Sequence, residues 1–433
     1  MMVWDIFAVM VGCFILTAMV LKWPVGIAMM STTLIALVYS GQWTDWPHLI
    51  EGSMAYLDAM LVIATAMIFM RSLIATGRLQ AVSDAIVRRF GNRPWVLLPL
   101  LMLLVMFPGM LTGSSTAAVL TSGVLVAPVL LSLGLDKARV AAIVAMGSIL
   151  GMVAPPVNLP VMIIGSGVDM PYTGFTIPLL LLTMPLAWVI VYLLGYPVLR
   201  KRSAVTQAAV KSAAVHEEEP EHEQPDAIGA VTKTVSLVNA LIPIVIIVAW
   251  MIADRVWIGV LPAIGLPLLF ILGAALSFAM SGKGPWLRET LAAIKQSLPV
   301  LSILAGVGMF IQVMTLLGVR GTLVVSLLSL PPVLQYLGMG LGIPAFGAIS
   351  AYGAASVLGV PFLLALLGKN EIIVGAALSL LTGVADLTPP TALAGIFAAQ
   401  AVGLKSYGSV MRMCIIPAII TTIVALVTIA WIA

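Results

Sequence analysis

Long apolar segments, separated by short polar stretches, run along almost the whole chain. About ten of these segments approach or exceed the roughly 20 residues that a helix needs to cross a bilayer. They cover residues 6–22, 25–41, 57–77, 138–168, 174–199, 236–252, 256–281, 297–317, 371–400 and 411–432. The pattern therefore predicts an all-α polytopic membrane protein.

Two further apolar segments, residues 94–134 and 333–368, are interrupted near their middle by small and polar residues. The first contains GMLTGSSTAAVLTSGVLVAP and the second contains GIPAFGAISAYGAASVLGVP. Peptide groups in lipid have no water to bind, so irregular backbone persists only where protein or a polar cavity covers it. Each segment is long enough for two full spans, but its middle, rich in Gly and Ser, favours a re-entrant helical hairpin.

A Pro-Pro pair follows each of these motifs and interrupts the next apolar segment. Pro155-Pro156 follows the first motif by 27 residues, and Pro389-Pro390 follows the second by 28. The similar spacing predicts a duplicated chain, in which each repeat holds one hairpin and one Pro-Pro-broken helix. Broken helices at corresponding positions of two halves indicate the binding site of a secondary transporter.

The basic residues divide unequally between the two faces that these spans define. If each hairpin returns to its own side, one face collects 17 of the 21 Lys and Arg residues. The opposite face has only Arg255, Arg320 and Lys369, together with several acidic residues. Because cytoplasmic loops are rich in Lys and Arg, both termini are expected on the outside.

The two repeats are predicted to be inverted, because five spans, an odd number, separate the hairpins. The likeness extends upstream of the hairpins. Residues 48–78 and 286–319 each read as a short amphipathic helix, a span and a glycine, with Arg71 and Gln312 at matching places. Inverted repeats that meet at broken helices are a common plan of secondary transporters.

This plan divides the chain into parts that are expected to stay fixed and parts that are expected to move. The expected scaffold comprises residues 1–77, 174–202, 235–296 and 404–433. The expected transport part comprises 78–173 (an arm, the first hairpin and broken helix) and 297–403 (a span, the second hairpin and broken helix). Residues 203–234 are polar and charged and predict a disordered cytoplasmic linker.

The hairpin tips and the Pro-Pro breaks form the candidate binding site. Helix N-termini suit a carboxylate, whereas unwound carbonyls and hydroxyls suit a sodium ion. The candidates are Gly113, Ser114, Ser115, Thr116, Pro155, Pro156 and Asn158 in the first repeat, and Gly347, Ser350, Tyr352, Gly353, Asp386, Thr388, Pro389, Pro390 and Thr391 in the second. The alternative for the first tip is close helix packing by small residues.

Two charged residues lie inside predicted spans. Asp386 is the one clear acid deep in a span. Such an acid is a functional candidate: it can carry a proton, hold a cation, reject a wrong substrate or cap the broken backbone. Arg71 lies about two helical turns from the inner face, where its side chain is expected to reach the lipid headgroups.

Composition excludes several other classes of protein. Hydrophobic residues make up 61% of the chain and charged residues 9%, which excludes a soluble domain. The net charge of +4 follows from the topology and calls for no nucleic-acid partner. No predicted span contains a histidine and no HExxH motif occurs, so neither an enzyme activity nor a cofactor is expected. A channel or an assembly scaffold remains as a different class.

At these motifs the chain resembles the large membrane subunit of TRAP transporters, within the wider ion-transporter superfamily. The resemblance runs in order through residues 59–79, 109–143, 147–158 and 383–403. Its most specific features are GSS before a Pro, then Gly-Leu-Asp, then a Pro-Pro pair, with TPP after the second hairpin.

The resemblance implies a bacterial inner-membrane subunit that imports organic acids, including dicarboxylates, by sodium symport. It implies two partners, a small membrane subunit and an extracytoplasmic solute-binding protein. It also implies that hairpins and broken helices move together against a scaffold. The positions that it implies for sodium and substrate are Ser114, Ser115, Pro155, Pro156, Thr388, Pro389 and Pro390.

The chain departs from the family pattern in three places. Val157-Asn158 stands where the family usually has Ser, and Thr391-Ala392 stands where it usually has a Val-Gly type of sequence. Asp386 is also outside the usual pattern. These departures keep a second interpretation open, in which the chain is a stand-alone carboxylate carrier that couples transport to sodium or, through Asp386, to a proton.

Overall fold

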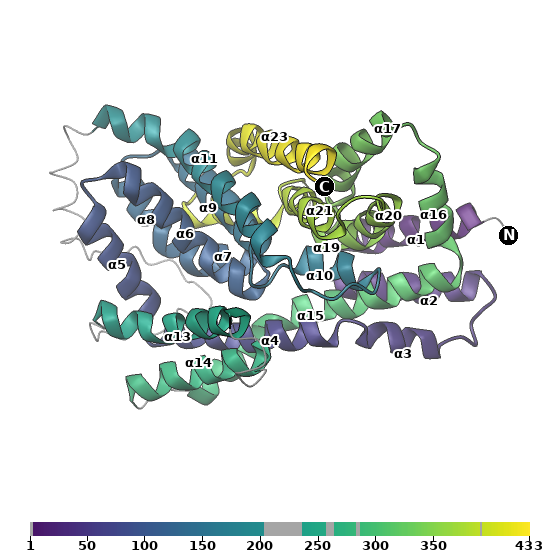
Figure 1. Cartoon of the computed structure of the whole chain (residues 1–433), viewed down its shortest axis with the longest axis horizontal. Coiled ribbons are helices and arrows are strands. Elements are labelled where there is room, and N and C mark those ends of the chain that lie inside the picture. The colour runs from purple at the N-terminus through teal and green to yellow at the C-terminus, as the bar shows by residue number, and fades with distance from the viewer. Residues whose placement is uncertain (1–2, 203–235, 257–263, 283–285, 390–391) are drawn as a thin grey trace.

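The structure, a computed structural model, describes residues 3–202, 236–256, 264–282, 286–389 and 392–433. Helices form all the regular secondary structure of these residues (Figure 1). Within these described residues, seven helical segments are long and apolar enough to cross a bilayer, and shorter apolar helices accompany them. The all-α class is confirmed. The linker predicted at 203–234 lies outside the described residues.

The first repeat begins with helices that precede its hairpin. They are α1 (Val3–Ile15) with a π-helical turn η1 (Leu16–Val20), α2 (Val25–Tyr39), α3 (Pro47–Met54), α4 (Leu57–Ala75) and α5 (Arg78–Phe90). The hairpin is α6 (Pro94–Thr112), α7 (Ser115–Ala118), η2 (Val119–Gly123) and α8 (Val124–Ser132). The broken helix is α9 (Lys137–Met152) and α10 (Leu159–Ser166), and α11 (Thr176–Arg202) follows.

The second repeat has nearly the same order of elements. It begins with α13 (Leu237–Val256), α14 (Leu266–Ser281), α15 (Trp286–Leu316) and α16 (Val319–Leu328). Its hairpin is α17 (Pro332–Leu337), η3 (Gly338–Gly342), α18 (Ile343–Phe346), α19 (Ala351–Ala354), η4 (Ala355–Gly359) and α20 (Val360–Ala365). The broken helix is α21 (Glu371–Ala385) and α22 (Leu393–Ala401), and α23 (Gly408–Trp431) ends the chain.

One element differs from its counterpart and from the prediction. In the first repeat a turn at Ala55 and Tyr56 separates the short helix α3 from the span α4. In the second repeat the corresponding helix and span form the single helix α15, because no turn interrupts them. The domain boundary expected between residues 296 and 297 therefore falls inside one helix.

The two repeats interlock instead of lying side by side. Helix α2 of the first repeat packs against α15 of the second, and α14 of the second packs against α4 of the first. Glycines permit the closest of these contacts: a Cβ on Gly26 would lie 2.4 Å from the carbonyl carbon of Ser302. Close approach at small residues is a typical means of helix association in membranes.

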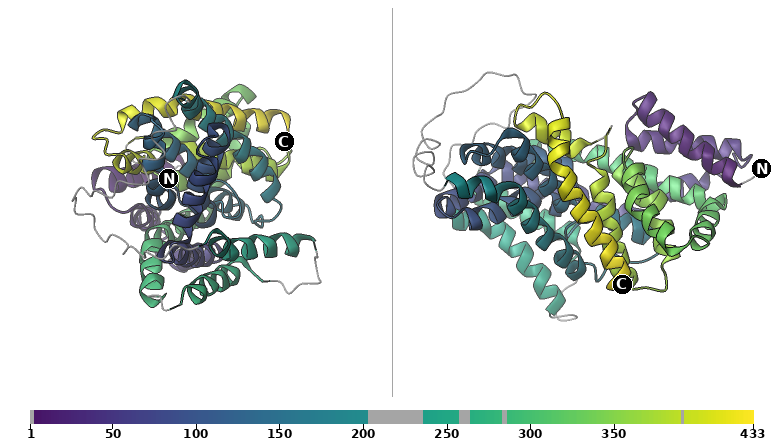
Figure 2. Two further views of the ribbon diagram at one scale, coloured as in Figure 1. Left: turned by 90° about the vertical axis from the view of Figure 1, so that its left-hand side faces the viewer. Right: turned by 90° about the horizontal axis from the view of Figure 1, so that it is seen from above.

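The last helix of each repeat lies on the hairpins and broken helices. Helix α11 packs against α6 and α9, and α23 packs against α21 and α9. In the right-hand view of Figure 2, α23, in yellow, lies apart from the purple N-terminal helices. Residues 174–202 and 404–433 were predicted to join the scaffold, but these contacts associate them with the predicted transport part.

A buried arginine attaches the arm α5 to the other repeat. Arg78 is 1% exposed, and its guanidinium donates to Ser277 Oγ and Ser277 O, both at 3.1 Å, and to Asn239 O. It also donates to Ser281 Oγ at 3.2 Å. The arm begins after Gly77, whose φ of 70° suits glycine and allows the sharp change of direction. The start of the arm is thus fixed to α13 and α14.

The structure corrects the prediction for Arg71. Its side chain does not extend to the headgroups but forms an ion pair with Glu289 of α15, with Nη2 2.8 Å from Oε2. The two side chains are 19% and 10% exposed. The pair therefore joins α4 of the first repeat to α15 of the second.

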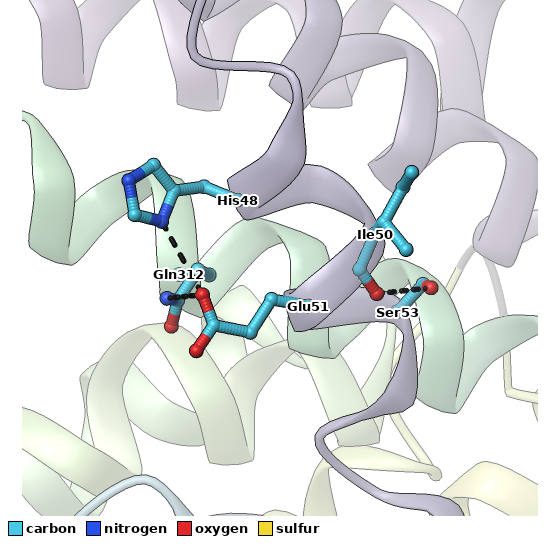
Figure 3. Close-up of polar contacts among 5 residues, drawn as sticks. All are labelled: His48, Ile50, Glu51, Ser53 and Gln312. Atoms are coloured by element: carbon cyan, nitrogen blue, oxygen red, sulfur yellow. Dashed lines mark hydrogen bonds and ion pairs between the residues drawn. The ribbon is translucent and has the colours of Figure 1, made fainter.

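The matching position in the second repeat makes the matching contact (Figure 3). Gln312 of α15 donates to Glu51 of α3 at 3.2 Å, and His48 Nδ1 lies 3.4 Å from the same carboxylate. Glu51 and Glu289 occupy corresponding places in the two repeats, as Arg71 and Gln312 do. The two contacts are thus related by the repeat symmetry, but the Glu51 side chain is 69% exposed.

We predict that Arg71→Gln lowers the free energy of unfolding by about 1–3 kcal/mol, because it leaves a shielded carboxylate without its cation. Thermal unfolding in detergent measures the change, and adding Glu289→Gln should recover part of it. The control is Glu51→Gln at the exposed counterpart, which should cost only about 0.2–1 kcal/mol. Equal losses in Arg71→Gln and Glu51→Gln would contradict this interpretation.

Candidate functional site

The first hairpin reverses direction over Gly113 and Ser114. Gly113 ends α6 with a φ of 62°, in the left-handed region that suits glycine. Ser114 is extended, and its hydroxyl accepts a hydrogen bond from Ala117 N at 3.3 Å, which caps the second arm. Val157 N, at the first Pro-Pro break, donates to Met110 O at 3.0 Å. The tip therefore ends beside the middle of a broken helix, as a re-entrant hairpin does.

The second hairpin reverses over residues 347–350 with the same serine cap. Ser350 is extended, and its hydroxyl accepts from Gly353 N at 3.1 Å. Gly347 packs so closely on α21 that a Cβ would lie 2.0 Å from Cβ of Ala385. Each second arm then contains a π-helical turn at the same distance from its serine, η2 or η4. The two hairpins are therefore copies of one unit.

Asn158 holds the first broken helix together. It follows the cis peptide bond between Pro155 and Pro156 and caps α10, accepting from Val161 N at 3.0 Å. Its Nδ2 donates to Val153 O at 2.6 Å and to Ser379 Oγ of α21 at 2.9 Å. The side chain is fully buried, and both its oxygen and its nitrogen form hydrogen bonds. It therefore bonds to backbone groups that the break leaves without helical partners, and it joins the two repeats.

The second break is bonded to the first hairpin tip. Asp386 follows the last residue of α21 as its C-cap. Ser115, in the first turn of α7, donates its hydroxyl hydrogen bond to Asp386 Oδ2 at 2.5 Å. A carboxylate from one repeat and a hydroxyl from the other thus meet directly.

The remaining residues of the second break lie close to this contact. Tyr407 donates from its hydroxyl to Leu387 O at 2.6 Å and so satisfies one carbonyl of the unwound chain. Thr388 is half-buried and Pro389 is exposed. The predicted site residues Pro390 and Thr391 lie outside the described residues.

Tyr352 connects the two hairpin tips. Its hydroxyl donates to Gly113 O at 2.9 Å and lies 3.6 Å from Sδ of Met152. The contacts Tyr352–Gly113 and Ser115–Asp386 together join both tips and the second break. We call these four residues the tip cluster.

Some of the predicted site residues meet in the tip cluster, whereas others lie beside it or bond elsewhere. Ser114 and Ser350 are backbone caps next to the tip cluster, and Thr116 is half-buried on α7. Asn158 bonds to Ser379 instead of to the cluster. Sequence reasoning missed Tyr407, because a tyrosine just before the last span reads as an interfacial aromatic residue.

The chemistry of the tip cluster is that of oxygen atoms. It offers a carboxylate, two hydroxyls and a carbonyl, and Asp386 is its only charged member. Such hard oxygens suit a small cation such as sodium. Asp386 also stands at the C-terminal end of α21, where the helix dipole favours positive charge.

The comparisons with known proteins concern the family and the fold of the chain. Residues 9–433 match the family described as "Tripartite ATP-independent periplasmic transporter, DctM component". A search of curated proteins finds no match. Among solved structures, the chain is similar to the Alcanivorax borkumensis YdaH transporter, with 15% identity and a TM-score of 0.58 over 91% of this chain and 89% of that one. That likeness concerns the fold.

The family match covers almost the whole chain, and duplicated broken helices are common in secondary transporters. This chain belongs to the DctM family, the large membrane component of tripartite ATP-independent periplasmic (TRAP) transporters.

Proposed function

We propose that this subunit imports a small organic acid anion together with sodium, by alternating access of an elevator type. The observation that carries the proposal is the tip cluster, in which groups from both inverted repeats meet beside two interruptions of the helical backbone. Sites of this kind, at the interface of two repeats, are typical of secondary transporters.

The packing suggests which helices move. Helices α1 to α4 and α13 to α15 interlock through α2–α15 and α14–α4 contacts and would form the scaffold. The hairpins and broken helices, with α11 and α23 packed on them, would move as one transport part. In this division α15 belongs wholly to the scaffold, and α5 and α16 link the two parts.

The cellular setting follows from family membership and from charge. The proposed partners are a small TRAP membrane subunit and an extracytoplasmic solute-binding protein, which would deliver the solute. The proposed place is the bacterial inner membrane, with the face rich in Lys and Arg towards the cytoplasm and both termini outside. A stand-alone carrier is the alternative that the unusual Asp386 keeps open.

We predict that sodium, but not potassium or choline, raises the melting temperature of the purified subunit in detergent. A ligand that binds only the folded state stabilises it in proportion to the logarithm of its concentration. A lack of any sodium effect would contradict sodium coupling.

We predict that replacing Ser114 and Ser115 together by Val abolishes uptake, because the tip loses its cap and its contact with Asp386 and gains bulk. Uptake of labelled solute into cells that carry the complete system measures this. Ser132→Val, at the far end of the same hairpin, is the control and should retain uptake. Full uptake in the double variant, with normal amounts in the membrane, would refute a site at this tip.

A further inference from the structure

Positive charge is scarce in the hairpins and the broken helices. No Lys or Arg occurs in residues 94–136, 140–199, 332–368 or 370–404, which include both hairpins and both breaks. Asp386 is therefore a carboxylate without a basic residue nearby in the sequence. In the described residues it also takes part in no ion pair, since the pairs there join other side chains.

The groups that face Asp386 do not supply the missing charge. Ser115 of α7 donates one hydrogen bond to Oδ2. Tyr352 of α19 donates to Gly113 of the same cluster, and Tyr407 before α23 donates to the carbonyl of Leu387, the residue after Asp386. All of these side chains are neutral near pH 7. The C-terminal end of α21 adds partial negative charge.

The lack of positive charge around Asp386 is unfavourable for a solute that carries only negative charge. A carboxylate placed a few ångströms from Asp386 would meet a like charge in a region of low dielectric constant, where such repulsion is strong. A single sodium ion at the tip cluster balances one negative charge, so with a carboxylate solute one of the two negative charges stays uncompensated. An ammonium group on the solute would supply the missing cation.

We propose that Asp386 determines the charge class of the solute, and that the transported organic acid is a zwitterion whose ammonium group pairs with Asp386. The proposal rests on the proposed transport function and deepens it. The geometry is compatible with this, because Asp386 is partly exposed and Ser115 holds its Oδ2 by a hydrogen bond. The acidic end of the solute would lie away from α21.

Pairs of probes that differ only in the ammonium group test this proposal. Taurine and isethionate form one such pair, and L-alanine and L-lactate, or L-glutamate and L-2-hydroxyglutarate, form others. Thermal shift and calorimetry on the purified subunit in sodium would measure their binding to the wild type, to Asp386→Asn and to Ser115→Ala. Melting temperatures without ligand show whether each variant folds.

We expect the ammonium member of at least one pair to bind the wild type more tightly than its hydroxyl counterpart. Asp386→Asn should weaken that binding by about 10- to 100-fold, as expected for a lost charge-assisted hydrogen bond, and should leave the hydroxyl member unchanged or tighter. Ser115→Ala, which retains the carboxylate, should keep the preference for ammonium.

Two outcomes would overturn the inference and separate its failure from that of the proposed function. If the hydroxyl members bind as tightly as the ammonium members, the solute is a simple anion, and the subunit remains a carboxylate transporter. If sodium stabilises the subunit but no probe of either kind binds, ammonium recognition at Asp386 is refuted while sodium coupling stands. If sodium also has no effect, the proposed sodium coupling fails as well.

Discussion

The structure depends on one constraint: peptide groups in a bilayer must find hydrogen-bond partners within the protein. Unbroken helices meet this requirement by themselves, and every interruption needs a substitute. Ser114, Ser350 and Asn158 each accept a backbone N–H at the start of a new helical segment, and Tyr407 donates to a carbonyl of the second break. The interruptions are thus stable and can present polar atoms to a solute.

Each of the two inverted repeats contains such capped interruptions, and the inverted arrangement brings the two sets together. Each broken helix is bonded to the other repeat, through Asn158 to Ser379 in one case and through Asp386 to Ser115 in the other. The outer parts follow the same symmetry, since Arg71 pairs with Glu289 where Gln312 pairs with Glu51. The paired side chains differ between the two repeats, so the charge of corresponding contacts differs although the backbone arrangement is the same.

Much of the fold could be predicted from the sequence, because hydrophobic length, small residues and Pro-Pro pairs have strong local effects on helices. The hairpins, the breaks and the duplication all follow from such signals. The contacts across the repeats could not be predicted, since they depend on which helix faces meet in space. Arg71 illustrates the limit: its depth suggested contact with headgroups, while its partner Glu289 is distant in the sequence.

The candidate site was predicted as a set of positions but not as a network. The Gly and Ser residues of the tips identified where the backbone breaks, and Asp386 stood out as a lone acid. That Tyr352 reaches Gly113, or that Ser115 reaches Asp386, depends on the depth at which each hairpin ends. Val157-Asn158, a departure from the family pattern, proves to include a cap of the first broken helix.

The proposed elevator-type mechanism requires the hairpins to move relative to the scaffold, and Phe14 of α1 offers a direct measurement. Its ring lies 6.4 Å from that of Phe346 in the second hairpin and 6.5 Å from that of Phe310 in α15. In a chain with Cys13 and Cys414 replaced, a short cross-link between cysteines at 14 and 346 should stop uptake, and one between 14 and 310 should not. Unimpaired uptake with the 14–346 cross-link in place would contradict the account.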